Sequence, residues 1–423
     1  MKNTTFFILC FLISSISFAQ NWNTLSLPST GRYDDVFFID ENIGWAINST
    51  NYEVSKSTDG GETWNLQFST VDEHLRNIVF LDHNRGFLGT LTSSFYKTSN
   101  GGQTWELINI PGVEAICGLD VVGDSIVYGC GAYFEPAYII KSSDGGDNWT
   151  FIDMSAYATG LVEVLFIDEY TGFACGKNED GGIILKTTDG GQVWTEIFNT
   201  GLPGEYVWKM QQLFSNQDVF FASVQSIWPN YGKMIKSIDG GNTWVAKDIY
   251  SNDPSALFDP SIQGIGFVSE NHGWASGHYS TLLETFDGGD TWELAANGSV
   301  INVNRFQVIN ENLVFAAGTQ LYKYTNNLGT ESHLGELHKG LEINISPNPI
   351  DNQLNISIIF EKKNHMVITL FDGQGKKIRQ LARETILTEG EQVYSFDFPY
   401  PSGIYYVHFH SDVEAKSIKI VKD

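Results

Sequence analysis

The stretch KSTDGGETWNL, residues 56–66, decides the fold because close copies of it return at a regular spacing. The further copies are KTSNGGQTW (97–105), KSSDGGDNW (141–149), KTTDGGQVW (186–194), KSIDGGNTW (236–244) and ETFDGGDTW (284–292). The acid or amide in each copy stands at position 59, 100, 144, 189, 239 or 287, so the period is 41 to 50 residues. Repeats of this length in a strand-rich chain are typical of a β-propeller with one four-stranded sheet per repeat.

Each repeat contains four strand-like runs. In the first repeat, VFFIDENIGWAI (36–47) reads as two strands joined by a turn, EVSKS (53–57) as the third strand and WNLQF (64–68) as the fourth. Short apolar runs bounded by Asp, Asn and Gly are the pattern of antiparallel strands. The repeated string is therefore expected to be the hairpin between the third and fourth strands.

The last repeat is incomplete. Residues 305–327 supply three strands, and no tryptophan strand follows them. Residues 21–28 look like the missing fourth strand, with Trp22 in the tryptophan position. Pairing of the two ends would close the ring and remove its free sheet edges. We therefore predict an all-β chain with a seven-bladed β-propeller over residues 20–328.

The repeated string is similar to the Asp-box of sialidases and related propellers, S/T-x-D-x-G-x-T-W. Its acid can accept hydrogen bonds from its own turn, its glycines permit positive φ, and its tryptophan can pack between blades. Six equal copies around a ring cannot converge on one substrate, so we interpret the box as structural. The structural positions are Asp59, Trp64, Asn100, Trp105, Asp144, Trp149, Asp189, Trp194, Asp239, Trp244, Asp287 and Trp292.

The N-terminus and the charge indicate where the protein works. Residues 1–19 combine Lys2, an apolar run and the small–x–small ending Ser17-Phe18-Ala19, which indicates a secretory signal peptide. The formal net charge is −25, which repels nucleic acid and anionic lipid and excludes both as main partners. We expect an exported, soluble monomer with no membrane insertion. Since P-loop, HExxH and paired CxxC motifs are missing from the sequence, no metal and no cofactor is expected.

Three cysteines remain after removal of the signal peptide: Cys117, Cys130 and Cys175. The segment LDVVGDSIVYGC reads as a hairpin that turns at Gly123-Asp124. A two-residue turn would place Cys117 directly opposite Cys130, so we predict a disulfide between them and a free Cys175. Two separate buried thiols are the alternative.

A binding site is expected on the face that carries the variable loops. In each blade the loops between strands two and three, and the links between blades, lie opposite the repetitive turns. Binding residues usually sit on such variable loops. Trp and Tyr stack on the apolar faces of sugars, whereas ordinary loop packing is the alternative for each residue. The candidate ligand-binding residues are Arg76, Tyr133, Trp208, Trp228, Tyr231 and Arg305.

The ends of the links between blades should ring the central channel. A mixed rim of acids and cations could bind a polar ligand, or its members could simply pair with one another at the surface. Besides the arginines and acids named elsewhere, the rim includes Arg32, Asp34, Asp35, His74 and Lys209.

Glycoside hydrolysis is the enzymatic alternative, since Asp-box propellers include sialidases and glucan hydrolases. Such chemistry needs two opposed carboxylates at a defined separation, and the candidates are Glu114, Glu163, Glu205 and Asp259. The resemblance to sialidases would further require three arginines around the substrate carboxylate and an Arg-Ile-Pro signature, which is missing. The glucan hydrolases clamp substrate between two propellers, whereas this chain has one.

The C-terminal residues change in character. A polar linker over residues 329–340 precedes alternating strand patterns over 341–423, which predict a small Ig-like β-sandwich. This segment resembles the C-terminal sorting domain of the type IX secretion system. The resemblance implies export across the outer membrane and contact with that machinery. The matching positions include Pro347, Asn348, Pro349, Gly403, Lys419 and Lys422.

Together these observations favour a secreted or cell-surface binding protein. An extracellular glycan is the first expected ligand and a surface protein the second, with glycoside hydrolysis as the alternative function. Single propellers of this repeat also resemble photosystem-assembly proteins, but those use a basic face and this chain is acidic.

Overall fold

The computed structural model describes residues 21–131, 133–251, 260–278, 280–295, 300–326, 342–350, 352–360, 364–372, 377–387, 390–411 and 415–422. The predicted signal peptide and linker lie outside these residues. The described residues form strands and no helix, and they divide into two compact units, residues 1–329 and 330–423. Accordingly, no described helix is long and apolar enough to cross a membrane.

In the first unit, strands β1 to β28 pair into antiparallel sheets of four. The first sheet is β2 (Tyr33–Phe38), β3 (Gly44–Asn48), β4 (Glu53–Ser57) and β5 (Asn65–Ser69). The second is β6 (Leu75–Phe80), β7 (Gly86–Thr90), β8 (Phe95–Thr98) and β9 (Glu106–Ile108). The third is β10 (Gly118–Val122), β11 (Ile126–Cys130), β12 (Tyr138–Ser142) and β13 (Thr150–Asp153).

The remaining sheets follow the same order. The fourth is β14 (Gly160–Phe166), β15 (Gly172–Lys177), β16 (Gly182–Thr187) and β17 (Thr195–Asn199). The fifth is β18 (Tyr206–Gln212), β19 (Phe220–Gln225), β20 (Lys233–Ser237) and β21 (Val245–Asp248). The sixth is β22 (Ile262–Phe267), β23 (Gly273–Gly277), β24 (Leu283–Thr285) and β25 (Glu293–Leu294). The last is β26 (Arg305–Asn310), β27 (Leu313–Ala317) and β28 (Leu321–Thr325), completed by β1 (Asn21–Thr24).

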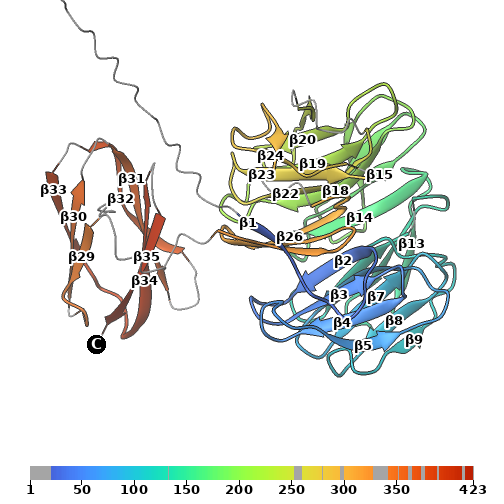
Figure 1. The fold of residues 1–423 in the computed structure, drawn as a ribbon, viewed down its shortest axis with the longest axis horizontal. Coiled ribbons are helices and arrows are strands. Elements are labelled where there is room, and N and C mark those ends of the chain that lie inside the picture. The colour runs from blue at the N-terminus through green and yellow to red at the C-terminus, as the bar shows by residue number, and fades with distance from the viewer. Residues whose placement is uncertain are drawn as a thin grey trace, which may run out of the picture. The chain divides into compact units, whose positions relative to one another are not determined.

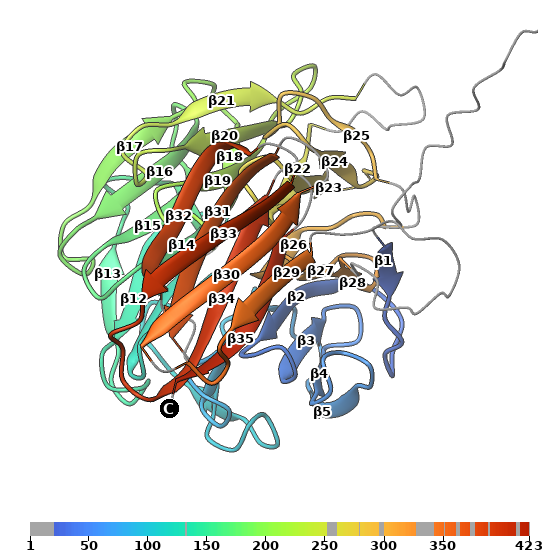
Figure 2. The ribbon, with the colours of Figure 1, turned by 90° about the vertical axis from the view of Figure 1, so that its left-hand side faces the viewer.

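The sheets are arranged as a closed ring. Their first strands contact one another in the order β2, β6, β10, β14, β18, β22 and β26, and β26 contacts β2 again. Figure 2 shows the same progression, from blue β2–β5 through green β14–β17 to β26–β28 beside β2. Most of the first strands are almost fully buried, whereas fourth strands such as β13 are mostly exposed. The first strands therefore surround the central axis of the ring.

The two ends of the first unit meet in one sheet. Strand β1 pairs antiparallel with β28 (Figure 2). In this pairing Trp22 lies opposite Tyr324. The strand is shorter than the predicted 21–28: it ends at Thr24, after which the N–H of Leu25 still donates to the carbonyl of Leu321 at 2.9 Å.

The repeated turn is held by its own hydrogen bonds. In the first copy, the Asp59 carboxylate accepts from the Thr63 N–H at 2.9 Å and from the Thr63 hydroxyl at 2.6 Å. Gly60 and Gly61 have φ of 70° and 87°, where L side chains are strained. The Trp64 indole N–H donates to the Gly61 carbonyl at 3.0 Å. The Asp59 carboxylate and the Trp64 indole are therefore engaged within the turn.

Acid is expected to weaken these turns. Hydrogen bonds from Thr63 hold the pKa of Asp59 at about 2, and those from Asn148 and Thr291 do the same for Asp144 and Asp287. The folded pKa values lie below the unfolded value of about 3.9, so this stabilisation is present above about pH 4 and lost as the pH falls toward 2.

The second copy of the turn shows that an uncharged side chain can occupy this position: the Asn100 side chain accepts from the Thr104 N–H at 2.9 Å and donates to the Thr104 hydroxyl at 2.8 Å. The variant Asp59→Asn should fold at pH 7, and its stability deficit relative to the wild type should shrink in urea unfolding at pH 3. An unchanged deficit at the two pH values would contradict the prediction.

The predicted Cys117–Cys130 disulfide is wrong. Both thiols are free and buried, as is that of Cys175. The hairpin turn contains three residues, since Val122 pairs with Ile126, and the register therefore shifts by one. As a result Cys130 lies opposite Gly118, and Cys117 precedes the strand.

The second unit consists of two sheets around one core (Figure 1). One sheet contains β29 (Glu342–Ser346), β30 (Gln353–Phe360) and β33 (Gly390–Asp397). The other contains β32 (Lys377–Leu387), β31 (Asn364–Asp372), β34 (Gly403–Ser411) and β35 (Ala415–Lys422). The core is formed by alternating residues such as Leu354, Ile356 and Ile358 on β30, and Val407 and Phe409 on β34.

The predicted sorting motif is brought together at the end of this core. The side chain of Asn348, between Pro347 and Pro349, accepts from the Val421 N–H at 2.9 Å and donates to the Lys419 carbonyl at 3.3 Å. At the start of β34, Gly403 pairs with Lys422. The Pro-Asn-Pro segment therefore binds the last strand of the chain.

Candidate functional site

The loop face is defined here as the end of the ring that carries the loops between second and third strands and the links between sheets. Large apolar side chains are exposed on this face along three neighbouring sheets, β10–β13, β14–β17 and β18–β21. They are Tyr133, Phe134, Tyr157, Leu202, Ile227, Trp228, Tyr231 and Tyr250. Groups of exposed apolar side chains of this kind mark interaction sites in soluble proteins.

Trp228 is the most exposed of these side chains. It stands in the β19–β20 loop, where the Asn230 N–H closes a turn on the Ile227 carbonyl at 2.9 Å. The side chain at the tip of this turn is 78% exposed. Tyr231 of the same loop contacts Tyr250 of the next link, with ring centroids 5.5 Å apart. Two predicted ligand-binding residues, Trp228 and Tyr231, are therefore presented to solvent.

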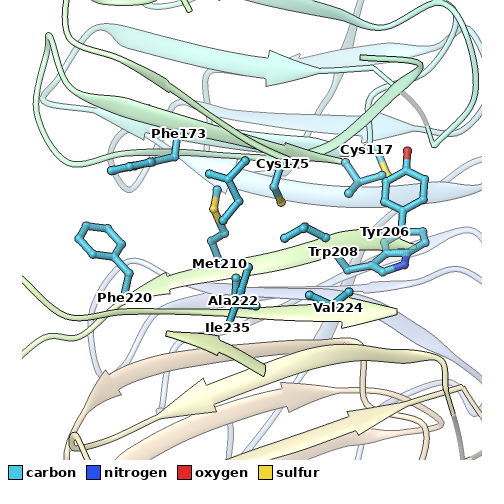
Figure 3. Close-up of a cluster of buried hydrophobic side chains, with 13 residues drawn as sticks. Cys117, Phe173, Cys175, Tyr206, Trp208, Met210, Phe220, Ala222, Val224 and Ile235 are labelled. Carbon is cyan, nitrogen blue, oxygen red and sulfur yellow. The ribbon is translucent and has the colours of Figure 1, made fainter. Parts of the chain in front are cut away.

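Trp208 is placed differently from the prediction. It lies within β18 and is only 8% exposed. Its ring packs against Tyr206 at 5.0 Å and Tyr133 at 6.4 Å, and the Arg76 guanidinium lies 6.0 Å from its centroid. Figure 3 shows Tyr206 and Trp208 together beside Cys117. Of the predicted binding residues, the structure therefore brings together the buried Arg76 and Trp208 and the exposed Tyr133.

Several of these positions arise from β-bulges, which sequence reasoning missed. The pairing of the first and second strands skips one residue in six sheets. Five of these skips lie near the start of the first strand, between Tyr33/Asp35, Leu75/Asn77, Leu161/Glu163, Val207/Lys209 and Ile262/Gly264, and the sixth lies between Val308/Asn310. The skipped residues include Asp34, Arg76 and Trp208. A bulge re-aims the side chain of the extra residue and is common beside functional sites. The sequence signal is a polar residue that interrupts an apolar strand, as in YDDVFF and LRNIVF.

The carboxylate of the bulged Asp34 pairs with basic side chains near the loop face. Its carboxylate pairs with Arg32 at 2.6 Å, His74 at 2.8 Å and Arg76 at 3.6 Å. Burial alone would raise the pKa of Asp34, but the His74 hydrogen bond and the charges of Arg76 and Arg32 hold this pKa well below its usual range. The carboxylate therefore stays ionised at neutral pH.

A second charge network lies deeper on the axis. Glu163 accepts hydrogen bonds from Lys209 and from Arg305, the latter at 2.6 Å, and Arg305 also pairs with Asp35 at 3.1 Å. Burial raises the pKa of Asp35. For Glu163, Lys209 and Arg305 outweigh burial and hold its pKa below the ordinary value. Arg305 is thus engaged inside the channel rather than presented at the loop face.

Of the remaining predicted catalytic carboxylates, the structure describes Glu205 and Glu114. Glu205 is fully buried and accepts from the Ser226 hydroxyl and the Lys233 ammonium, each at 2.5 Å. Glu114 is exposed on the link before β10. Asp259 lies outside the described residues. A general acid for glycoside hydrolysis needs a raised pKa, and the pKa of Glu163 is lowered instead.

The second unit can now be assigned by comparison. Residues 344–423 match the family of secretion system C-terminal sorting domains. This match confirms the predicted type IX sorting domain, which implies export to the cell surface or beyond.

The first unit is a β-propeller, as its closed ring of sheets and its relatives agree. The chain is 26% identical over 290 residues to the photosystem II assembly lipoprotein Ycf48 of Synechococcus sp. (strain CC9902), covering 64% of this chain and 78% of that protein. It is similar to the structure of YCF48 bound to D1 peptide, with 20% identity, a TM-score of 0.55, and coverage of 72% of this chain and 96% of that one. It also resembles PorZ, a surface component of the type IX secretion system of Porphyromonas gingivalis, with 13% identity, a TM-score of 0.53, and coverage of 93% and 59%.

Proposed function

We propose that this protein is a secreted or cell-surface binding protein whose propeller recognises an extracellular glycan through its loop face. The observation that carries the proposal is the exposure of Trp228 at the tip of its turn, with Tyr231 and Tyr250 beside it. Aromatic side chains on loops that a rigid propeller holds in place can stack on sugar faces at little entropic cost, because these loops are already positioned before the ligand binds.

We propose that the other segments of the chain bring this loop face to the outside of the cell. Residues 1–19 direct the chain to the periplasm, and the Ig-like sandwich over 341–423 engages the type IX machinery. The sheets of the first unit are the blades of a seven-bladed propeller over residues 20–328, and the repeated turns are Asp-boxes. The linker over 329–340 joins the two domains.

A polypeptide is the second candidate ligand. The similarity to YCF48 bound to D1 peptide supports it, since a propeller of this kind can accommodate a peptide. Hydrolysis is less favoured, because Glu163 and Glu205 are each paired with a lysine.

The glycan proposal predicts a loss of binding in Trp228→Ala. The full chain, applied to an array of microbial, plant and host glycans, should bind a discrete set. Loss of one exposed aromatic anchor should weaken that binding at least tenfold, as truncation of a central aromatic side chain does in other interfaces. Because Trp228 is exposed, thermal unfolding of the variant should match that of the wild type. Trp208→Ala is a poor test, since its buried ring also supports the fold.

Val71→Ala is the matched control. Val71 is also an exposed apolar side chain on the loop face, but it lies in the β5–β6 link, away from the three aromatic sheets. Equal losses in the two variants would argue against a site around Trp228. If no glycan on the array binds, a surface protein becomes the proposed ligand instead.

A further inference from the structure

A cavity lies in the axial channel on the far side of the Glu163 network from the loop face. Its volume is about 290 Å³. Strand β18 begins at the loop face, and the cavity follows it from Lys209 to Gln212 and on to Phe214 in the next turn. Phe214 is 75% exposed, so the cavity opens at the end of the ring that carries the repeated turns. This site is therefore separate from the aromatic loops.

The wall of this cavity contains a carboxyl group without a cationic partner. Asp120 on β10 accepts from the Phe166 N–H at 2.6 Å and from the Val121 N–H at 2.9 Å. Among the described residues, no Lys, Arg or His forms an ion pair with it, in contrast to Asp35 and Glu163, which pair with Arg305.

The charge of Asp120 is not needed for its structural bond. Asp120 links its strand to the backbone of Phe166 in the next sheet. Gln211 makes the corresponding link to Phe267, and Gln307 makes it to Phe38, in each case accepting from the backbone N–H and donating to the carbonyl. Two neutral side chains thus make the corresponding link, so this link does not require the charge of Asp120.

The surroundings of Asp120 favour a positive ligand. The charged groups that act on it are Glu163 of β14 and Arg305 of β26, and Glu163 has the larger effect. Lys209 of β18 lines the same cavity but is paired with Glu163, while the neutral phenol of Tyr128 approaches from β11. Burial raises the pKa of Asp120 to about 7. A cation bound beside Asp120 would reverse this shift and release the proton.

We propose that this cavity binds a small primary ammonium compound with an apolar tail, the ammonium group on Asp120 and the tail along the apolar wall. That wall is formed by Leu165, Met210, Ile265, Phe306 and Val308. Burial of the tail supplies the hydrophobic part of the affinity. Anions are disfavoured because Lys209 and Arg305 already carry carboxylate partners.

The test compares three probes that share one tail. Hexylamine, hexan-1-ol and hexanoate are titrated into the full chain by calorimetry. Hexylamine should bind at least tenfold more tightly than either of the others, with proton release near pH 7. Its affinity should rise roughly tenfold from pH 6 to pH 8 as Asp120 ionises. Asp120→Asn retains the acceptor for Phe166 and should lose both the tenfold preference and the pH dependence.

Two further variants keep the result interpretable. Asp124→Asn changes an exposed acid in the turn that follows β10 and should leave hexylamine binding unchanged. Val308→Trp should fill the cavity and abolish binding while Asp120 remains. The proposal is overturned if no probe binds at millimolar concentration, if hexanoate binds best, or if folded Asp120→Asn binds hexylamine as the wild type does.

Discussion

Replacement of Trp22 with alanine is expected to lower the free energy of unfolding by about 3–5 kcal/mol, the range for large aromatic side chains removed from a core. The Trp22 ring is 3% exposed and lies at the seam of the ring. Its centroid is 5.3 Å from that of Trp274, 5.9 Å from Phe306 and 5.5 Å from Tyr324, so it joins the sixth sheet to the last. Strand β1 has only four residues, and the ring of Trp22 is its main anchor.

Urea unfolding of the full chain would measure this loss, with Trp228→Ala as the control. The same change at the exposed Trp228 should alter the free energy of unfolding by no more than about 0.5 kcal/mol. Without Trp22, β1 should also detach more readily and expose the edge of β28, which protease cleavage near the N-terminus would detect. A loss below about 1 kcal/mol in Trp22→Ala would show that β1 is dispensable for ring closure.

The repeated string carries most of the information about the fold. Because each copy fixes a hairpin between the third and fourth strands, the remaining strands of a repeat can be assigned by their apolar runs. The same reasoning predicts a strand over residues 21–28, since Trp22 occupies the tryptophan position without a box before it, and the structure has this strand over Asn21–Thr24. The repeat period can be recognised even where a single strand or turn is misassigned, because each repeat is an independent copy of the same pattern.

Local register is less accessible from the sequence. The hairpin around Gly123 was expected to turn on two residues, and one additional turn residue was enough to separate Cys117 from Cys130. Bulges have a similar effect on the first strands, where Trp208 is itself the inserted residue and is buried rather than presented to solvent. Such choices depend on contacts with neighbouring sheets, which a strand pattern does not contain.

The candidate site was predicted in part. Its loops and its exposed rings follow from composition, as Trp228 and Tyr231 illustrate. The ion pairs on the axis could not be predicted from composition, since Glu163, Lys209 and Arg305 come from three different sheets. The cavity beside Asp120 could not be predicted from the sequence for the same reason, because its walls combine five strands that are far apart in the chain.

Glu163→Gln is expected to destabilise the propeller by about 3–5 kcal/mol, as removal of one partner from a buried ion pair does. The Glu163 carboxylate is buried and serves both Lys209 and Arg305. Arg305 keeps Asp35 as a partner in the variant, whereas Lys209 is left without a described carboxylate partner. Asp147→Asn is the control, because Asp147 is 71% exposed in its pair with Lys97, and such pairs contribute at most about 1 kcal/mol.

The pH dependence of stability and a double variant distinguish the electrostatic contribution of the Glu163–Lys209 pair from the packing of its side chains. The folded pKa of Glu163 is lowered, so its contribution is present above the unfolded value of about 4.3 and is lost as the pH falls through the folded pKa. The deficit of Glu163→Gln should therefore shrink on acidification. Adding Lys209→Met removes the unpaired charge, and the double variant should recover part of the stability. If the double variant is less stable than Glu163→Gln, the cost lies in lost packing of the lysine stem rather than in a stranded charge.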